Sequence, residues 1–106
     1  MISDFATEKT KIYTINRDSN GQETLSYHKT VYCYLEKIET SAIDKSGVRT
    51  ACDGILYARD IRLPYPDMVF ELDGKLYQPI TMEIFKIGFA FSKFKVQEAS
   101  QKWDFL

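Results

Sequence analysis

The stretch MVFELDGKLYQPITMEIF, residues 68–85, decides the fold class of this chain. Apolar residues alternate along both of its halves, which is typical of β-strands whose two faces meet different surroundings. Asp73 and Gly74 join the halves, and an Asp-Gly pair favours the two-residue turn of a β-hairpin. The stretch therefore predicts a hairpin that turns alternate residues of 68–72 toward a core and its tyrosine and glutamates outward. Pro79 places the return strand either at a sheet edge or at a kink.

Outward from this hairpin, the chain keeps predicting strands. Residues 11–15, residues 30–38 and residues 48–60 are rich in β-branched and aromatic side chains, and one last strand follows Gly88. The pair Asp53-Gly54 interrupts the third of these stretches, either as a tight turn or, in the interpretation we prefer, as a bulge.

A chain of 106 residues is large enough for one domain with one core. We therefore expect an all-β fold, a small barrel or sandwich of about five to seven short antiparallel strands with extended terminal arms. Residues 1–10 form an N-terminal arm in this interpretation, residues 11–97 the β core, and residues 98–106 a C-terminal tail, as a short helix or an arm.

Composition excludes several classes of function. The 14 basic and 15 acidic side chains leave a net charge of −1, whereas a dedicated nucleic-acid binder usually carries a basic excess. No window approaches the roughly 20 apolar residues of a membrane span. The first five residues lack the pattern of a signal peptide, so we expect the product to stay in the cytoplasm where it is made.

Signatures of catalysis and cofactor binding are also missing from the sequence. His28 is the only histidine, no Cys-x-x-Cys pair exists, and the glycines are scattered without a phosphate-binding loop. Cys33 and Cys52 lie in strand-like apolar stretches and are expected to be buried free thiols. We expect no enzyme, no metal and no cofactor, with His28 as a solvated surface residue.

Aromatic residues are abundant for so small a core. Seven tyrosines, seven phenylalanines and one tryptophan either line the core or reach the surface, where tyrosine and tryptophan favour contacts between proteins. The candidates for contacts with neighbouring subunits or partners are Tyr32, Tyr34, Tyr65, Trp103 and Phe105.

A second interpretation of the aromatics is a surface for single-stranded nucleic acid. Such surfaces interleave basic and aromatic side chains on an oligonucleotide-binding barrel. The residues that fit this pattern are Phe91, Phe94, Lys93, Lys95 and Lys102.

The order of these elements resembles a known family. A short β chain with an early strand pair, then GVRTACDGILYARDIRLP (residues 47–64), then DGKLYQPITMEIFKIG (residues 73–88), resembles the head-closure or stopper proteins of tailed bacteriophages. These are minor components of the head-to-tail connector. The resemblance spans roughly residues 30–97 and lies in strand order and pattern, so a tail terminator, a tail-tube relative or another virion component fits it as well.

The resemblance implies a function without catalysis. A stopper forms a homo-oligomeric ring in the neck of the virion, between the portal or its adaptor and the tail, and closes the channel through which packaged DNA leaves. It implies assembly in the host cytoplasm, no membrane partner, no cofactor and no sequence-specific DNA binding. The loop expected to face the channel is, by position, Glu39, Thr40, Ser41, Ala42, Ile43, Asp44, Lys45, Ser46 and Gly47.

Overall fold

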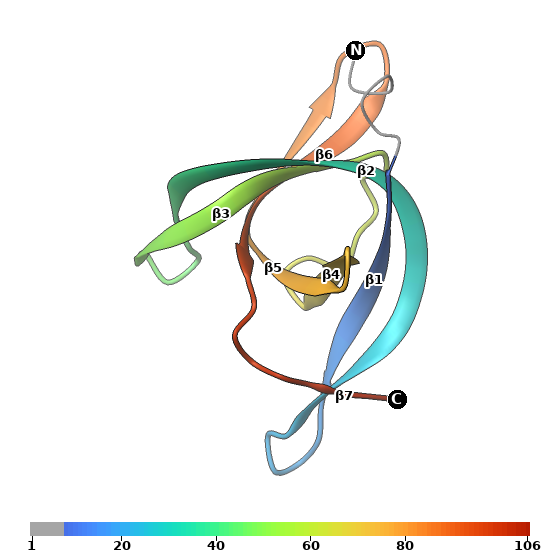
Figure 1. Ribbon diagram of the computed structural model, residues 1–106, viewed down its shortest axis with the longest axis vertical. Helices are drawn as coiled ribbons and strands as arrows, with labels where there is room; N and C mark the ends of the chain where they lie inside the picture. Colours follow the sequence, from blue (N-terminus) through green and yellow to red (C-terminus); the bar gives the residue numbers. More distant parts are fainter. Residues whose placement is uncertain (1–7) are drawn as a thin grey trace.

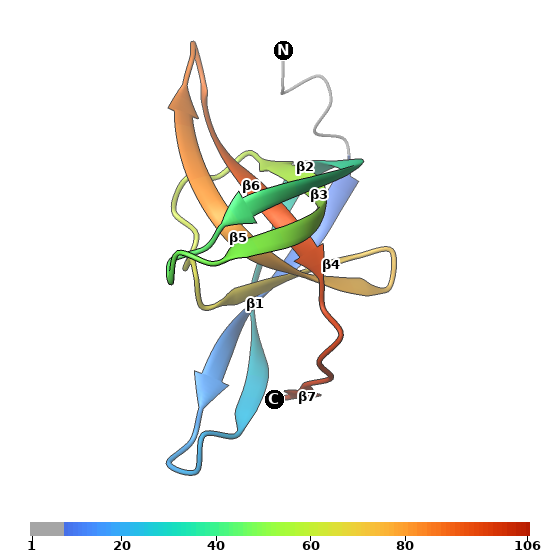
Figure 2. The same ribbon diagram turned by 90° about the vertical axis from the view of Figure 1, so that its left-hand side faces the viewer.

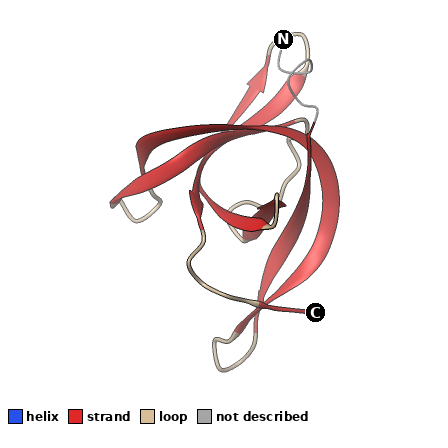
Figure 3. Cartoon of the chain, viewed as in Figure 1, coloured by secondary structure: helices blue, strands red, loops and turns tan. Residues whose placement is uncertain are grey.

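The computed structural model describes residues 8–106 of the chain. This range contains seven β-strands and the loops that connect them. Figure 3 shows only strands and connecting loops in this range. The strands are β1 (Glu8–Arg17), β2 (Glu23–Ile43), β3 (Arg49–Ala58), β4 (Met68–Leu72), β5 (Lys75–Lys86), β6 (Ala90–Glu98) and β7 (Asp104–Phe105). Of the expected N-terminal arm, residues 1–7 lie outside the described range and residues 8–10 belong to β1.

Six of the strands close into a barrel. They are hydrogen-bonded in the order β1-β4-β5-β6-β3-β2, and β2 pairs with β1 to complete the ring, which Figure 1 shows end on. All of these pairs are antiparallel, whereas β7 adds to β2 as a short parallel strand. The expected all-β barrel is confirmed.

The long strand β2 makes this closure possible. Its 21 residues pair with β1 as far as Cys33 and with β3 from Cys33 onward. The first half of β2 therefore pairs with β1, and its second half pairs with β3. The sequence predicted only residues 30–38 of it, because the flanking segments are polar and take strand geometry from their partners rather than from local pattern.

The hairpin of residues 68–85 has the predicted turn. Asp73 and Gly74 both have positive φ, 53° and 76°, as a type I′ turn requires. The prediction for Tyr77 was wrong: its register partner is Phe70, so the two share the core face and Tyr77 is buried. Pro79 pairs with Val96 of β6 but lies past the last β4 partner, Tyr77, and the β5–β6 register shifts beside it.

A bulge does lie beside Gly54, but its extra residue is on the partner strand. Lys37 pairs with Gly54 and Thr40 pairs with Cys52, so two residues of β2 face the single Asp53. Gly54 allows the strands to approach closely, because a Cβ there would lie 2.7 Å from the backbone oxygen of Glu36. The glycine is thus used for close approach rather than for a turn.

The barrel interior holds one apolar core, with contributions from the first six strands. It consists of Ile12, Val31, Cys33, Leu56, Ala58, Met68, Phe70, Leu72, Tyr77, Phe94 and Val96. A smaller outer cluster of Tyr13, Leu25, Val69 and Trp103 lies on the opposite side of β1 and β4. Alternation explains both, because Val69 and Phe70 are neighbours in β4 and join different clusters.

Three hairpins extend beyond the closed part of the barrel (Figure 1), and Figure 2 shows two of them, β5–β6 and β1–β2, at opposite ends of the long axis. The β1–β2 and β2–β3 hairpins share one turn design, in which an aspartate accepts hydrogen bonds from backbone groups two and four residues later. Asp18 binds the amides of Asn20 and Gln22, and Asp44 binds those of Ser46 and Val48, at 2.8 to 3.0 Å. The third hairpin, β5–β6, turns through Gly88 at φ 68°.

Candidate interaction surfaces

The segment expected to face a channel is a strand and a tight turn. Glu39 to Ile43 are the end of β2, and only Asp44 to Gly47 form a loop, so the predicted loop of nine residues was too long. Hydrogen bonds from Ser46 and from the Val48 amide hold the pKa of the Asp44 carboxyl below its usual value. The side chain of Asp44 therefore bridges the turn through hydrogen bonds to the amides of Ser46 and Val48.

Apolar side chains flank this turn on both sides. Ile43 is 57% exposed and Val48 is 58% exposed. The hairpin lies near β5, where a shallow groove of about 340 Å³ runs between residues 44–46, Tyr65 and the segment 79–80. The Lys95 ammonium donates to the backbone oxygen of Ser41 at 3.0 Å, which ties the hairpin to β6.

The second apolar projection is the β5–β6 tip, which we define as residues 84–91. Ile84 and Ile87 expose 47% and 69% of their surfaces. Phe85 stacks on Phe91 with ring centroids 5.2 Å apart, and Phe89 lies 5.6 Å from Phe91. Sequence reasoning missed Ile84 and Ile87, because alternation along β5 does not reveal where the neighbouring strand stops.

The C-terminal strap, residues 99–106, crosses from the end of β6 to β2. Trp103 enters the outer cluster, and its indole Nε1 donates to Glu23 Oε1 at 3.0 Å. Gln101 Nε2 donates to the same oxygen at 2.9 Å, and Arg17 Nε donates to the other oxygen at 2.8 Å. These donors, Trp103 foremost, hold the pKa of Glu23 below its usual value. The tail is thus an arm rather than a helix.

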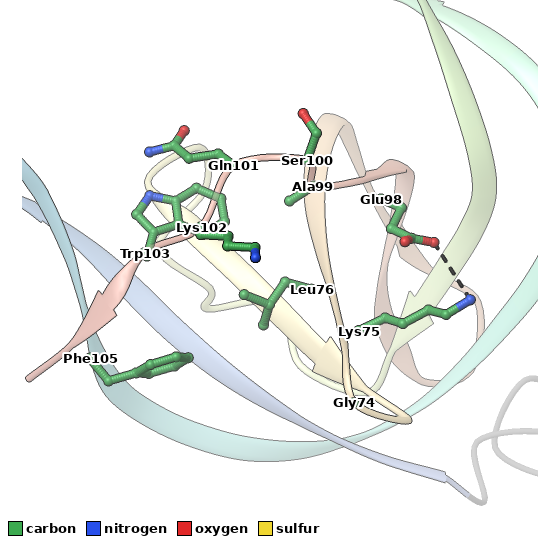
Figure 4. A pocket seen from close by; sticks show the side chains of 10 residues that line it. All are labelled: Gly74, Lys75, Leu76, Glu98, Ala99, Ser100, Gln101, Lys102, Trp103 and Phe105. Carbon is green, nitrogen blue, oxygen red and sulfur yellow. Dashed lines mark ion pairs between the residues drawn. The ribbon is translucent and has the colours of Figure 1, made fainter.

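A groove of about 380 Å³ opens between this strap and the β4–β5 turn. We call it the strap groove. Figure 4 shows the Leu76 side chain between the two walls, with Trp103 and Phe105 at one end and the Lys75–Glu98 ion pair at the other. Lys102 also lines it, so an apolar floor is bordered by charged side chains.

The five aromatic candidates for partner contacts separate into two groups. Tyr32 is 47% exposed and Phe105 is 52% exposed, so both present apolar surface to solvent. The other three pack mainly within the chain: Trp103 is buried, Tyr34 stacks on Tyr57 at 6.2 Å, and Tyr65 stacks on Phe94 at 6.2 Å. For Trp103 the prediction of a surface contact was wrong, because the outer cluster covers its ring.

The basic and aromatic surface considered for nucleic acid is only partly assembled: Phe91, Lys93 and Lys95 share the outer face of β6, and Phe94 does not. Phe94 is fully buried in the core, and Phe91, on the outer face of β6, packs against Phe85 and Tyr57. Lys95 is held by the β2–β3 hairpin. The pattern in the sequence mixed the two faces of one strand.

The next features are the possible metal ligands, the single histidine and the two cysteines. Within residues 8–106 no cluster of three histidine, cysteine or acidic side chains is placed to hold a metal. His28 is exposed, as predicted. Cys33 and Cys52 are buried free thiols, as predicted, and burial raises the pKa of Cys33 to about 12. In the same residue range no helix has the length and hydropathy to cross a membrane.

The fold is similar to that of a chain in the virion of a native gene transfer agent particle. The two structures agree with a TM-score of 0.60 at 13% sequence identity, over 90% of this chain and 96% of that chain. No protein-family model and no curated protein sequence matches this chain. At this low identity the likeness shows a shared fold.

Proposed function

We propose that this chain is a non-catalytic structural subunit of a phage-like virion. The observation that carries the proposal is the shared fold with a chain of a gene transfer agent virion, which extends over nearly the whole of both chains. A comparison that covers 90% of this chain and 96% of the other matches more than one common hairpin.

Within the virion we propose a place in the neck. There the chain forms a homo-oligomeric ring between the portal or its adaptor and the tail, closes the head and offers a docking surface to the tail. The resemblance of residues 47–64 and 73–88 to head-closure proteins supports this position. A near-zero net charge suits a ring through which DNA passes without being bound.

The surface of the subunit supports a role in assembly. Ile43, Val48, Ile84, Ile87 and Phe105 are each about half exposed or more, and they lie on projecting hairpins or on the strap. Exposed apolar side chains at such positions mark contacts with other proteins. A ring needs two different surfaces on each subunit, and this chain carries several.

We assign the channel-facing role to the β2–β3 turn, Asp44 to Gly47. Its fixed shape and its single lysine, Lys45, suit contact with passing DNA that does not become tight binding. Replacing residues 44–47 by a Gly-Ser turn of equal length should leave rings and particles intact and let heads lose their genome. Heads that retain DNA as well as wild type would remove this assignment.

The ring itself is tested by mass and by location. Light scattering of the purified protein, alone and after mixing with portal-containing heads, should give a ring or a monomer that joins heads. Electron microscopy should then place it at one vertex. A monomer that never joins particles would overturn the neck assignment, and binding to single strands at low salt would favour a nucleic-acid module instead.

A further inference from the structure

The β5–β6 tip lacks a third strand beside it. β3 pairs with β6 only from Ser92 onward, and β4 pairs with β5 only as far as Tyr77. A two-stranded ribbon has little stability of its own in water. This ribbon carries apolar side chains on both faces, because Ile84 is exposed opposite Ser92 while Phe85 stacks on Phe91 on the other face, and Ile87 is exposed at the turn. Such a projection gains most when a protein surface covers it.

The strap groove offers a surface of matching character. Its floor is formed by Leu76, Trp103 and Phe105, and its volume of about 380 Å³ is sufficient for the side chain of Ile87 together with part of the turn. The outer wall is the strap, which is anchored through Trp103 and Glu23. The groove is therefore preformed.

Tip and groove lie apart along the long axis of the molecule. Figures 1 and 2 both place the β5–β6 hairpin at one end of this axis, along which the molecule extends 44 Å, and β7 on the other side of the barrel, toward the β1–β2 hairpin at the far end. The tip of one chain therefore cannot reach its own groove. A contact between the two is head-to-tail, which is the type of contact that builds a ring.

Charges near the two surfaces are also complementary. The tip contains the base Lys86, and the acid Glu83 directly precedes it on β5. The groove is flanked by Lys102 and Asp104, again one base and one acid. A neighbour can therefore offer each charged side chain of the tip a partner of opposite sign at the exposed rim, where such pairs favour correct orientation.

We propose that the β5–β6 tip of one subunit seats in the strap groove of the next copy, with Ile87 on the floor formed by Leu76 and Phe105. This inference rests on the proposed ring and specifies its subunit contact. It requires that residue 87 of one copy lies beside residues 98–105 of its neighbour.

Cross-linking between two single-cysteine variants tests this contact. Ile87→Cys and Ser100→Cys are purified separately, mixed in equal amounts under conditions of assembly and joined by a short bismaleimide. The native Cys33 and Cys52 are buried and should not react. We expect the mixed dimer to exceed the dimers of either variant alone by at least about tenfold. Asn20→Cys, exposed on the β1–β2 turn, replaces Ser100→Cys as the matched control and should give no excess.

The variant Ile87→Asp tests the same contact without a chemical cross-linker. Residue 87 belongs to no core cluster, so the variant should keep the melting temperature of wild type and lose the oligomer. Asn20→Asp is the control, because it adds the same negative charge at an exposed position of the β1–β2 turn that is assigned to no contact, and it should keep the oligomer.

The outcomes separate this contact from the ring as such. Rings that form with no excess of the 87–100 product, or with an equal 87–20 product, would overturn the proposed contact and leave the ring standing. Rings that survive Ile87→Asp would do the same. If no variant and no wild-type sample forms an oligomer, alone or on heads, both proposals fail. A product of Ile87→Cys with a tail or portal protein alone would identify a different partner for the tip.

Discussion

The hydroxyl of Tyr65 donates a hydrogen bond to the backbone oxygen of Ile80 at 2.9 Å. Ile80 has no partner residue on β6, because the register shifts between Pro79 and Thr81. The Tyr65 ring also stacks on Phe94, and the Lys45 ammonium lies 5.1 Å from its centroid. One side chain thus joins the bulge of β5, the core and the β2–β3 turn.

We expect Tyr65→Phe to lower the free energy of unfolding by about 1–2 kcal/mol, because the backbone oxygen of Ile80 loses its donor in a partly buried place. Urea unfolding followed by circular dichroism measures the change. Tyr32→Phe is the control, since Tyr32 is exposed, and its stability should stay within about 0.5 kcal/mol of wild type. Equal stability of the two variants would show that the hydrogen bond to Ile80 contributes nothing.

Gly54→Ala should destabilise the barrel by about 1–3 kcal/mol, since the new Cβ would lie 2.7 Å from the backbone oxygen of Glu36 and the β2–β3 ladder would have to shift. Thermal unfolding measures this loss. Ala51→Ser, exposed on the same strand, should leave the melting temperature nearly unchanged. A Gly54→Ala variant as stable as wild type would show that the strands tolerate separation at this point.

Glu23 makes the C-terminal strap sensitive to acid. Its pKa in the folded state is below the unfolded value of about 4.3, so the stability it contributes is complete above that value and is lost as the pH falls through the folded pKa. We expect the fluorescence of Trp103, the only tryptophan, to shift to longer wavelength in that acid range before the barrel unfolds.

Glu23→Gln checks this assignment. The amide keeps the shape of the side chain but removes the charge, and it should weaken the strap by about 1 kcal/mol at neutral pH. Its Trp103 emission should no longer change with pH in the acid range. The exposed Glu39→Gln should behave as wild type. A pH response that persists in Glu23→Gln would assign the transition to another carboxylate.

Neither cysteine of the folded chain should react readily with a thiol reagent at pH 8. Burial raises the pKa of Cys33 to about 12, so only about one thiol in ten thousand is ionised at that pH. Cys52 is also buried, and burial raises its pKa as well. Absorbance after addition of an aromatic disulfide should report no thiol in the native protein and two in urea. A fast native reaction would show that the barrel opens locally.

Local signals explain how much of the fold was predictable. The hairpin of residues 68–85 and the strand at 49–58 carry their own alternation, and the pair Asp73-Gly74 carries its own turn, so these elements were predicted with nearly correct bounds. The burial of Trp103 could not be predicted, because it depends on Glu23, which lies 80 residues away in the sequence.

The candidate surfaces were less predictable for a related reason. Tyr32 and Phe105 are exposed as expected, yet the same reasoning assigned Trp103 to the surface, since residue type alone does not reveal which ring a neighbouring segment covers. The exposure of Ile84 and Ile87 was missed, because an exposed hairpin and a buried strand can have the same alternation of apolar residues in the sequence. Exposure at such positions follows from where the strands stop pairing, which is a property of the whole barrel.

The strand order also has a consequence for how the chain folds. β1, β2 and β3 pair with their neighbours in sequence, as do β4, β5 and β6, so each half can assemble from nearby contacts. The two joints between the halves, β1–β4 and β3–β6, link distant residues, and the core draws side chains from both halves. We expect closure of these joints to limit the refolding rate. Slowing of refolding by Val96→Ala at the β3–β6 joint, with unfolding little changed, would confirm that order.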